Sequence, residues 1–362
     1  VFYRSGGLIH PDCGSVEKRI SISHMTANSN RQVLIVGAGG YIGPVVTSAL
    51  LQRGYKVRAL DLFLYQTQSV LAAFADNPNF ELVKGDHCDA ALMETALADV
   101  TDVLILSGLV GDPITKTYPD ESQKINHDGI KAIIGQLRGR GLGRVIFVST
   151  CSNYGLIKDG ELADEEFELN PLSLYAKAKV AMELELLKQD RDVDFNPTVL
   201  RFATAFGLAP RMRFDLTVSQ FVRDMYLGHE MLVYDADTWR PYCHVQDFGN
   251  VIAKVLEAPA EKVAFEVFNA GGDINNFTKQ MIVDAILEKL PNVKVKYQEH
   301  GSDPRNYRVN FSKIRDRLGF EPEYTVSDGI AELIEALEKN TFANADDQPN
   351  FHGNYEIRYP LT

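Results

Sequence analysis

The chain of 362 residues has few cysteines, no long apolar run and no excess of basic side chains. Its four cysteines are widely scattered, and none form a Cys-x-x-Cys pair. This argues against a zinc site or a disulfide framework, so we expect no metal and a reducing, cytoplasmic location. No apolar run approaches the roughly 20 residues that a membrane span needs. The 37 basic and 49 acidic residues give a net charge of −12. That balance argues against nucleic acid or an anionic membrane as the main partner.

The two ends of the chain differ from the middle. Residues 1–24 lack the apolar core of a secretory signal and precede Met25, which looks like a natural start. We interpret them as an N-terminal extension outside the fold. Residues 341–362 are polar and rich in Asn, Asp and Pro, and are predicted to form a tail.

Between these ends, short β-branched runs alternate with helix-length segments. Continuous apolar runs predict buried parallel strands at 32–36, 56–60, 80–84, 103–106, 144–149 and 198–202. Helices are expected between them at 43–53, 90–99, 120–139 and 172–188. This α/β alternation predicts a Rossmann-type, doubly wound parallel sheet in residues 25–200. Helices expected at 216–227, 247–257, 277–289 and 326–339 predict a smaller C-terminal lobe over residues 201–340, interleaved with the sheet near 267–272.

A glycine-rich loop joins the first expected strand to the first expected helix. Gly37, Gly40 and Gly43 would permit a tight turn and let backbone amides approach a pyrophosphate. Asp61 ends the second strand, where a carboxylate accepts hydrogen bonds from a ribose diol and repels a 2′-phosphate. Alone, the glycines could be a turn and Asp61 a strand-end cap. Together they favour NAD over NADP.

Further cofactor contacts are expected where the other strands end. Asp86 follows the third strand and is placed to meet the adenine amino group, unless it only forms a turn. Small residues after the fourth strand would let a cofactor lie against the backbone. The additional candidate cofactor residues are Tyr41, Ile42, Asp86, His87, Ser107 and Gly108.

Two segments match Tyr-x-x-x-Lys, a pattern short enough to occur by chance. Tyr175 and Lys179 lie in a long helical run, which places both side chains on one face. A nearby ammonium and the positive nicotinamide would lower the pKa of the Tyr175 phenol, which could then accept a proton from a substrate hydroxyl. Lys179 would also hold the nicotinamide ribose. The other match is Tyr154 and Lys158, where Tyr154 is followed by Gly155 and a loop, so Tyr154 is interpreted as structural.

From about residue 30 to 335 the chain resembles extended short-chain dehydrogenases/reductases of the NAD-dependent nucleotide-sugar epimerase/dehydratase family. The resemblance rests on GAGGYIG, Asp61, GDHCD, STCSNYG, YAKAK, RFATAFG, WRPYCHVQDF and VFNAGG. It implies that Thr150 completes a catalytic set with Tyr175 and Lys179 by donating to the substrate oxygen.

The letters after Thr150 restrict the reaction. Family 4,6-dehydratases typically read Thr-Asp-Glu here, whereas this chain has Cys151 and Ser152. Members that epimerise at C3 and C5 carry a cysteine where Ser152 stands, and Cys151 is interpreted as a packing residue. Hydride transfer at a sugar hydroxyl remains, followed either by return of the hydride or by release of the ketone.

The resemblance also implies a site for a nucleotide-diphosphate sugar. Arg240 matches the family arginine that grips the diphosphate, since a guanidinium fork fits phosphate oxygens. Each candidate arginine could instead form a surface ion pair. Thr204 stands where many relatives have an asparagine that contacts substrate or nicotinamide. APRMRF and DPRNYR are similar to a branch that includes dehydrogenases of nucleotide-linked heptoses, so the sugar stays open. The candidate substrate residues are Thr150, Tyr175, Thr204, Arg211, Arg213, Arg240 and Arg305.

The sequence therefore predicts an NAD-dependent nucleotide-sugar 4-epimerase. The enzyme alternative is a C4 dehydrogenase or 4-ketoreductase, and the alternative of another class is a non-catalytic NAD-sensing protein. The resemblance further implies a homodimer that pairs the helices expected at 120–139 and 172–188.

Overall fold

A seven-stranded parallel sheet forms the centre of the molecule. The computed structural model describes residues 28–158, 160–189, 193–301, 303 and 305–360; the expectation for residues 1–24 lies outside them. The strand order is β10-β6-β5-β4-β1-β2-β3, and each neighbouring pair is parallel. The strands are β1 (Gln32–Val36), β2 (Lys56–Asp61), β3 (Phe80–Lys84), β4 (Asp102–Ile105), β5 (Arg144–Thr150), β6 (Asn196–Phe202) and β10 (Glu266–Ala270). The predicted α/β class is confirmed, and β10 is the expected return to the sheet.

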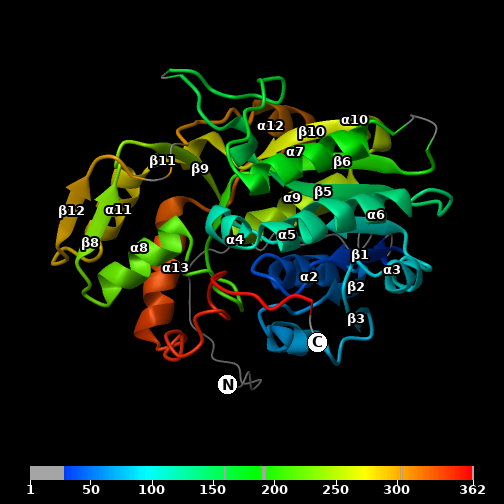
Figure 1. Ribbon diagram of the computed structural model, residues 1–362, viewed down its shortest axis with the longest axis horizontal. Helices are drawn as coiled ribbons and strands as arrows, with labels where there is room; N and C mark the ends of the chain where they lie inside the picture. Colours follow the sequence, from blue (N-terminus) through cyan, green and yellow to red (C-terminus); the bar gives the residue numbers. More distant parts are fainter. Residues whose placement is uncertain (1–27, 159, 190–192, 302, 304, 361–362) are drawn as a thin grey trace, which may run out of the picture.

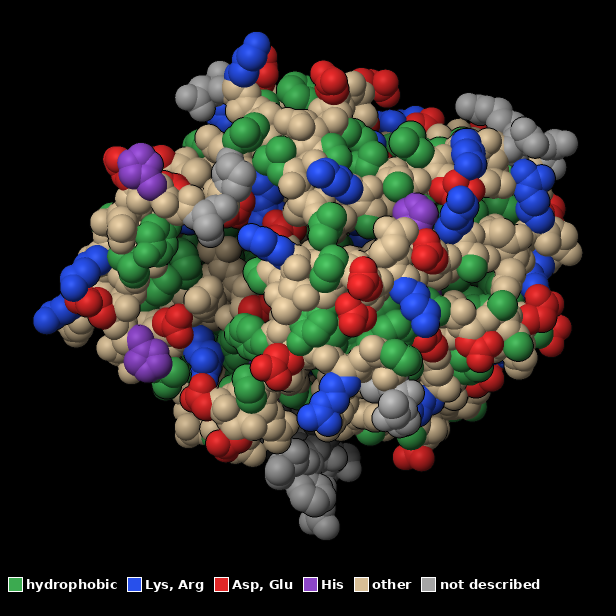
Figure 2. All heavy atoms as spheres, in the orientation of Figure 1, with side chains coloured by type: hydrophobic (Ala, Val, Ile, Leu, Met, Phe, Trp, Pro, Cys, Tyr) green, Lys and Arg blue, Asp and Glu red, His purple; other side chains and the backbone are tan. Residues whose placement is uncertain are grey.

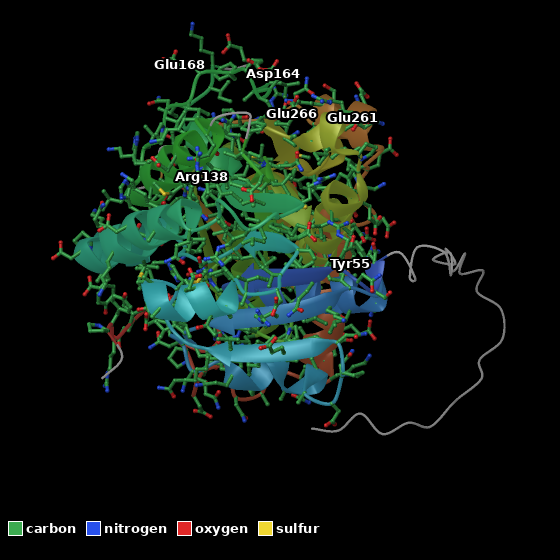
Figure 3. The ribbon with its side chains drawn as sticks, turned by 90° about the vertical axis from the view of Figure 1, so that its right-hand side faces the viewer. Tyr55, Arg138, Asp164, Glu168, Glu261 and Glu266 are labelled. Atoms are coloured by element: carbon green, nitrogen blue, oxygen red, sulfur yellow. The ribbon has the colours of Figure 1, made fainter. Side chains whose placement is uncertain are left out.

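Helices cover both faces of the sheet (Figures 1 and 3). One face packs on α2 (Gly43–Gln52), η1 (Gln68–Phe74), α9 (Val245–Glu257) and α12 (Ser312–Leu318). The other packs on α3 (Ala90–Ala96), α6 (Ile130–Gly135) and α7 (Leu174–Leu187). Strands β1, β4 and β5 are apolar and buried on both sides, as parallel strands between two helical layers must be. In Figure 3, Glu266 of β10 lies far from the blue strands at the opposite end of the sheet.

The predicted helix over 120–139 is three segments rather than one. A short α4 (Asp112–Thr117) precedes α5 (Pro119–Ser122), which continues as a π-helical turn, η2 (Gln123–Gly129), and then as α6. The neighbouring helix α7 begins at Leu174 because the Ser173 hydroxyl accepts a hydrogen bond from the Ala176 amide (3.1 Å) and caps it. Tyr175 therefore lies in the first turn of α7.

The C-terminal lobe has a core of its own. Helices α8 (Thr217–Tyr226), α11 (Lys279–Leu287) and α13 (Val326–Glu338) enclose it. Small sheets accompany them: β7 (Thr204–Phe206), β9 (Trp239–His244) and β11 (Asn276–Thr278) form one, and β8 (Met231–Tyr234) pairs with β12 (Val295–Gln298). The shorter elements are η3 (Cys151–Tyr154), α10 (Ala260–Val263) and η4 (Asp273–Asn275).

The chain after α13 has no further helix or strand in its described part, yet it packs against the body. Ala345 and Ile357 are buried, and Figure 1 shows this segment in red running from α13 across the molecule. Acidic and basic side chains are interspersed over the face in Figure 2. Within the described residues, no helix is both long and apolar enough to cross a membrane.

Candidate active site

All the candidate site residues from the sequence line one cavity of about 530 Å³. It lies at the carboxyl ends of β1, β2, β4 and β5 and is closed on the far side by residues of the C-terminal lobe. This edge is where ligands bind in open parallel sheets. The cavity thus brings together residues that lie far apart in the sequence, from Gly37 to Tyr355.

The backbone of the glycine loop packs so closely against its neighbours that side chains would not fit at two of its positions. A Cβ on Gly37 would lie 2.6 Å from the Ser107 backbone, and one on Gly43 would lie 2.2 Å from the Ala38 carbonyl. Gly37 also has a φ of 92°, which favours glycine. Helix α2 has no side-chain cap at Ile42 among the described residues. Ile42 and Gly43 line the cavity, so this helix N-terminus is available to an anionic group there. The Tyr41 hydroxyl donates to the Gly207 carbonyl (2.5 Å) and ties the loop to the C-terminal lobe.

Asp61 lies beside this loop. Its two carboxylate oxygens accept hydrogen bonds from the amides of Gly39 (2.7 Å) and Phe63 (2.6 Å). Burial raises the pKa of Asp61, while these amides lower it. Each oxygen retains a lone pair that a ribose hydroxyl can use.

The far end of the cavity is built by Asp86 and His87. Asp86 Oδ1 accepts from the Cys88 amide (2.8 Å), and Oδ2 accepts from the Tyr359 hydroxyl (2.9 Å). The buried His87 ring lies 3.1 Å from the Ile125 carbonyl, and burial lowers its pKa. Tyr359 was not a candidate, because nothing in the sequence connects residue 359 to residue 86.

Ser107 and Gly108 line the middle of the cavity. The buried Ser107 hydroxyl makes no hydrogen bond within the described part of the chain. Asn126, in the π-helical turn, accepts from the Leu109 amide (2.6 Å) and donates to the Leu109 carbonyl (2.9 Å). Asn126 thereby fixes the loop that carries Gly108. Sequence reasoning missed it, although π-helical turns often mark functional sites.

Thr150, Tyr175 and Lys179 meet at the end of β5. The Thr150 hydroxyl lies 2.8 Å from the Ser152 hydroxyl and also accepts from the Ser152 amide (3.1 Å). Lys179 is buried, donates to the Val148 carbonyl (2.8 Å), and lies 5.8 Å from the Tyr175 ring centroid. Ser152 also lines the cavity, beside Thr150.

The pKa values around this set differ from the sequence-based expectation. Burial raises the pKa of Tyr175, and Asp112 raises it further, against opposing effects of Arg213 and Arg305. Burial also lowers the pKa of Lys179 to about 8, against the raising effect of Glu183. Burial thus dominates the Tyr175 pKa in the protein alone, and the lowering by the ammonium and the nicotinamide stays a prediction for the complex with NAD.

Tyr154 lies outside the cavity lining and is fully buried. Its hydroxyl donates to Asn269 Oδ1 (2.7 Å) and accepts from Arg201 (3.1 Å). These contacts support its interpretation as a structural residue. Cys151 is likewise buried, and burial raises its pKa well above the usual value, as expected for packing.

The arginines reach the cavity from the C-terminal lobe, already engaged with protein groups. Arg213 forms a bidentate pair with Asp215 (2.6 Å for both contacts). Arg305 pairs with Asp303 (2.8 Å) and Asp112 (3.0 Å). Arg240 lies 3.1 Å from Asp303, but its buried Nη2 makes no aligned hydrogen bond within the described residues.

Arg211 differs from the other arginines because its guanidinium donates to backbone carbonyls of residues 350–353 in the C-terminal segment. Thr204 lies on β7 and is half-buried beside the cavity. The sequence did not single out Asp112, Asp215 or Asp303, since an isolated aspartate carries no pattern.

The fold and the cavity define an NAD-dependent enzyme of the extended short-chain dehydrogenase/reductase type. The family described as "NAD dependent epimerase/dehydratase family" matches residues 33–271, and the chain belongs to it. The glycine cradle, Asp61 and the unpaired Ser107 hydroxyl fit NAD.

Relatives of known activity differ in their reactions. The chain is 27% identical over 328 residues to a dTDP-glucose 4,6-dehydratase of Streptomyces niveus, covering 85% of this chain and 93% of the relative. It is 24% identical to UDP-glucuronic acid decarboxylase 1 of Arabidopsis thaliana, covering 87% and 72%. Among solved structures, it resembles a UDP-glucose 4-epimerase of Thermotoga maritima (TM-score 0.76, 24% identity, 86% and 99% coverage). It also resembles a UDP-glucuronic acid 4-epimerase of Bacillus cereus (TM-score 0.77, 19% identity, 85% and 99% coverage).

Proposed function

We propose that the protein is a nucleotide-sugar 4-epimerase. The observation that carries this proposal is the composition of the cavity wall after β5. Thr150 and Ser152 contribute hydroxyls there, and no carboxylate stands at residue 151 or 152. Elimination of water calls for an acid and a base on the sugar, whereas inversion at one carbon needs a proton acceptor and a hydride carrier. Solved neighbours that include 4-epimerases add support.

In this proposal, Tyr175 exchanges a proton with the sugar hydroxyl through its phenol oxygen. Thr150 donates to the same sugar oxygen. The Thr150 oxygen can accept from both the amide and the hydroxyl of Ser152. When the Ser152 hydroxyl is the donor, the Thr150 hydrogen is free for the substrate. Lys179 lines the cavity, and its hydrogen bond to the Val148 carbonyl fixes its position. Its ammonium places a positive charge beside the Tyr175 phenol. Bound NAD supplies the hydride acceptor.

The nucleotide end of the substrate belongs, in this proposal, to Arg240, Arg213 and Arg305. Arg240 offers its Nη2, which lies 3.1 Å from Asp303 without an aligned hydrogen bond in the described residues. A diphosphate gives the bidentate acceptor that guanidinium groups prefer. Asp215 holds Arg213 in place. Asp303 and Asp112, by contrast, pair with Arg305 and compete with the diphosphate for it.

A panel of UDP- and dTDP-linked sugars, followed by product configuration and by absorbance of NADH, tests the function. We expect interconversion of C4 isomers without net NADH. Net accumulation of NADH would instead identify a C4 dehydrogenase, and bound NAD without any turnover would identify an NAD-sensing protein.

A pair of matched tyrosine variants tests the proton acceptor. Tyr175→Phe should lower kcat by about 10²–10⁴-fold, the usual contribution of general acid–base catalysis. Tyr154→Phe should keep most of the activity and lower the melting temperature, because Asn269 and Arg201 lose a buried partner. The reverse pattern would show that Tyr154 is the proton acceptor.

We also propose a homodimer formed through η2, α6 and α7. These helices pack side by side, and Leu174 and Leu184 on α7 are 47% and 63% exposed. Light scattering should give a dimer for the full chain and a monomer for Leu184→Glu. A monomeric full chain would contradict the proposal.

A further inference from the structure

The C-terminal segment crosses the cavity as a strap, which we define as residues 350–360. Figure 1 shows it in red, running from the side of α8 and α13 toward the side of β2 and β3. The strap lies beyond residues 33–271, which the family model matches. The match to the family model therefore does not include the strap.

The strap is anchored in the C-terminal lobe by Arg211. This buried guanidinium donates to the carbonyls of Phe351 (2.9 Å), Asn350 (3.2 Å) and Gly353 (3.0 Å), and to Asn354 Oδ1 (2.8 Å). Burial lowers the pKa of Arg211 to about 10. The guanidinium of Arg211 therefore donates its hydrogen bonds to the strap.

The middle of the strap reaches the NAD-binding half. Asn354 Nδ2 donates to the Val110 carbonyl (2.8 Å), so one side chain joins Arg211 to the loop after β4. Ile357 is 8% exposed and packs with Leu109 and Ile114. Asn354 and Tyr355 themselves line the cavity.

The end of the strap contacts the position expected to bind adenine. The Tyr359 hydroxyl donates to Asp86 Oδ2 (2.9 Å), and the Lys124 ammonium lies 5.0 Å from the Tyr359 ring centroid. Because the Cys88 amide binds the other oxygen of Asp86, the Asp86 carboxylate is held in one orientation. Oδ2 keeps a second lone pair for a donor in the cavity.

We propose that the strap is part of the NAD site and retains the cofactor between turnovers. It spans both halves of the molecule over the cavity, so the cofactor cannot leave until these contacts open. The inference rests on the proposed function in one respect: an epimerase regenerates its NAD within each turnover and gains from retaining it. An enzyme that exchanges NAD for NADH at every turnover would be slowed by the same contacts.

Dissociation of NAD from the purified protein, measured by rapid displacement with an excess of a fluorescent NAD analogue, tests the strap without any sugar substrate. A variant that ends at Pro349 should release NAD at least about 10-fold faster, and Tyr359→Phe about 5-fold faster, since one hydrogen bond contributes on the order of 1 kcal/mol. Asn354→Ala should accelerate release as well. Asp346→Asn is the matched control, since it breaks the exposed ion pair with Arg223 (2.6 Å) in the same terminal segment away from the cavity.

Circular dichroism decides whether the shortened variant is folded, and the single variants carry the test if it is not. Unchanged release from Tyr359→Phe and Asn354→Ala would overturn the proposal. Slower release would overturn it too, because the strap would then compete with NAD. Neither outcome bears on epimerisation, and accumulation of NADH by the full chain would overturn the proposed function while leaving these rates interpretable.

Discussion

At the scale of single residues, Glu183 connects α7, which carries Tyr175 and Lys179, to the strand that carries Thr150. Tyr175, Lys179 and Glu183 are spaced by four along α7 and share one face. The buried Glu183 carboxylate accepts from the Ser149 hydroxyl, from Asn153 (2.8 Å) and from Arg201 (2.8 Å). Glu183 therefore binds Ser149 and Asn153, which lie before and after Thr150 in STCSNYG. We infer that Glu183 is a positioning residue for the proposed catalytic set of Thr150, Tyr175 and Lys179.

Glu183 also affects the charge of Lys179. The groups that face Lys179 are Tyr175 and Glu183 on its own helix, the Val148 carbonyl on β5, and His87, whose pKa Lys179 helps to lower. Burial holds the pKa of Lys179 at about 8, and Glu183 opposes this lowering. The ammonium is thus present below about pH 8 and is lost as the pH rises through that value.

Glu183→Gln should move the alkaline loss of activity to lower pH, because the contribution that raises the Lys179 pKa disappears. The variant should also melt at a lower temperature, since leaving Arg201 without its partner costs about 3–5 kcal/mol. The pH dependence of kcat and of NAD binding is the measurement. A structural role alone would lower activity equally at all pH values, so an unmoved midpoint would contradict a role in setting the charge of Lys179.

Local patterns in the sequence mark candidate site residues, but they do not show the long-range contacts that these residues make. Gly37, Asp61 and Tyr175 lie at fixed distances from the ends of recognisable strands and helices, so local pattern sufficed to single them out. Arg211 and Asp86 were singled out too, but their contacts with residues 350–354 and Tyr359 depend on how the chain folds back. No local pattern carries that information.

At the scale of secondary-structure elements, the apolar strands were predicted to within about two residues at each end. These strands were predictable because a continuous run of β-branched residues is stable as a parallel strand buried between two helical layers. The helix expected at 120–139 was wrong in form, because a π-helical turn inserts between α5 and α6. That turn brings Asn126 to both backbone groups of Leu109. The spacing of apolar residues does not predict such a π-helical turn, because buried residues continue through η2 into α6.

At the scale of the whole molecule, the two halves meet across the cavity through charged side chains. Asp112 follows β4 in the NAD-binding half, and Arg305 belongs to the C-terminal lobe. Their side chains lie 3.0 Å apart, and Asp303 also pairs with Arg305 (2.8 Å). Asp112 Oδ1 is buried without a hydrogen-bond partner in the described residues. Arg305 therefore forms ion pairs with two carboxylates at the place where a substrate diphosphate is proposed to bind.

Asp112→Asn should tighten the binding of UDP and dTDP to the NAD-loaded protein about 5-fold, since a diphosphate would then compete with one carboxylate fewer for Arg305. Isothermal titration calorimetry at two salt concentrations measures the change. Asp120→Asn is the matched control, because Asp120 is an exposed residue of the neighbouring α5 and carries the same charge. Equal tightening in both variants would assign the effect to net charge. Weaker binding in Asp112→Asn alone would mean that the bridge to Asp112 holds Arg305 in its binding position, and that the diphosphate adds to this bridge instead of replacing it.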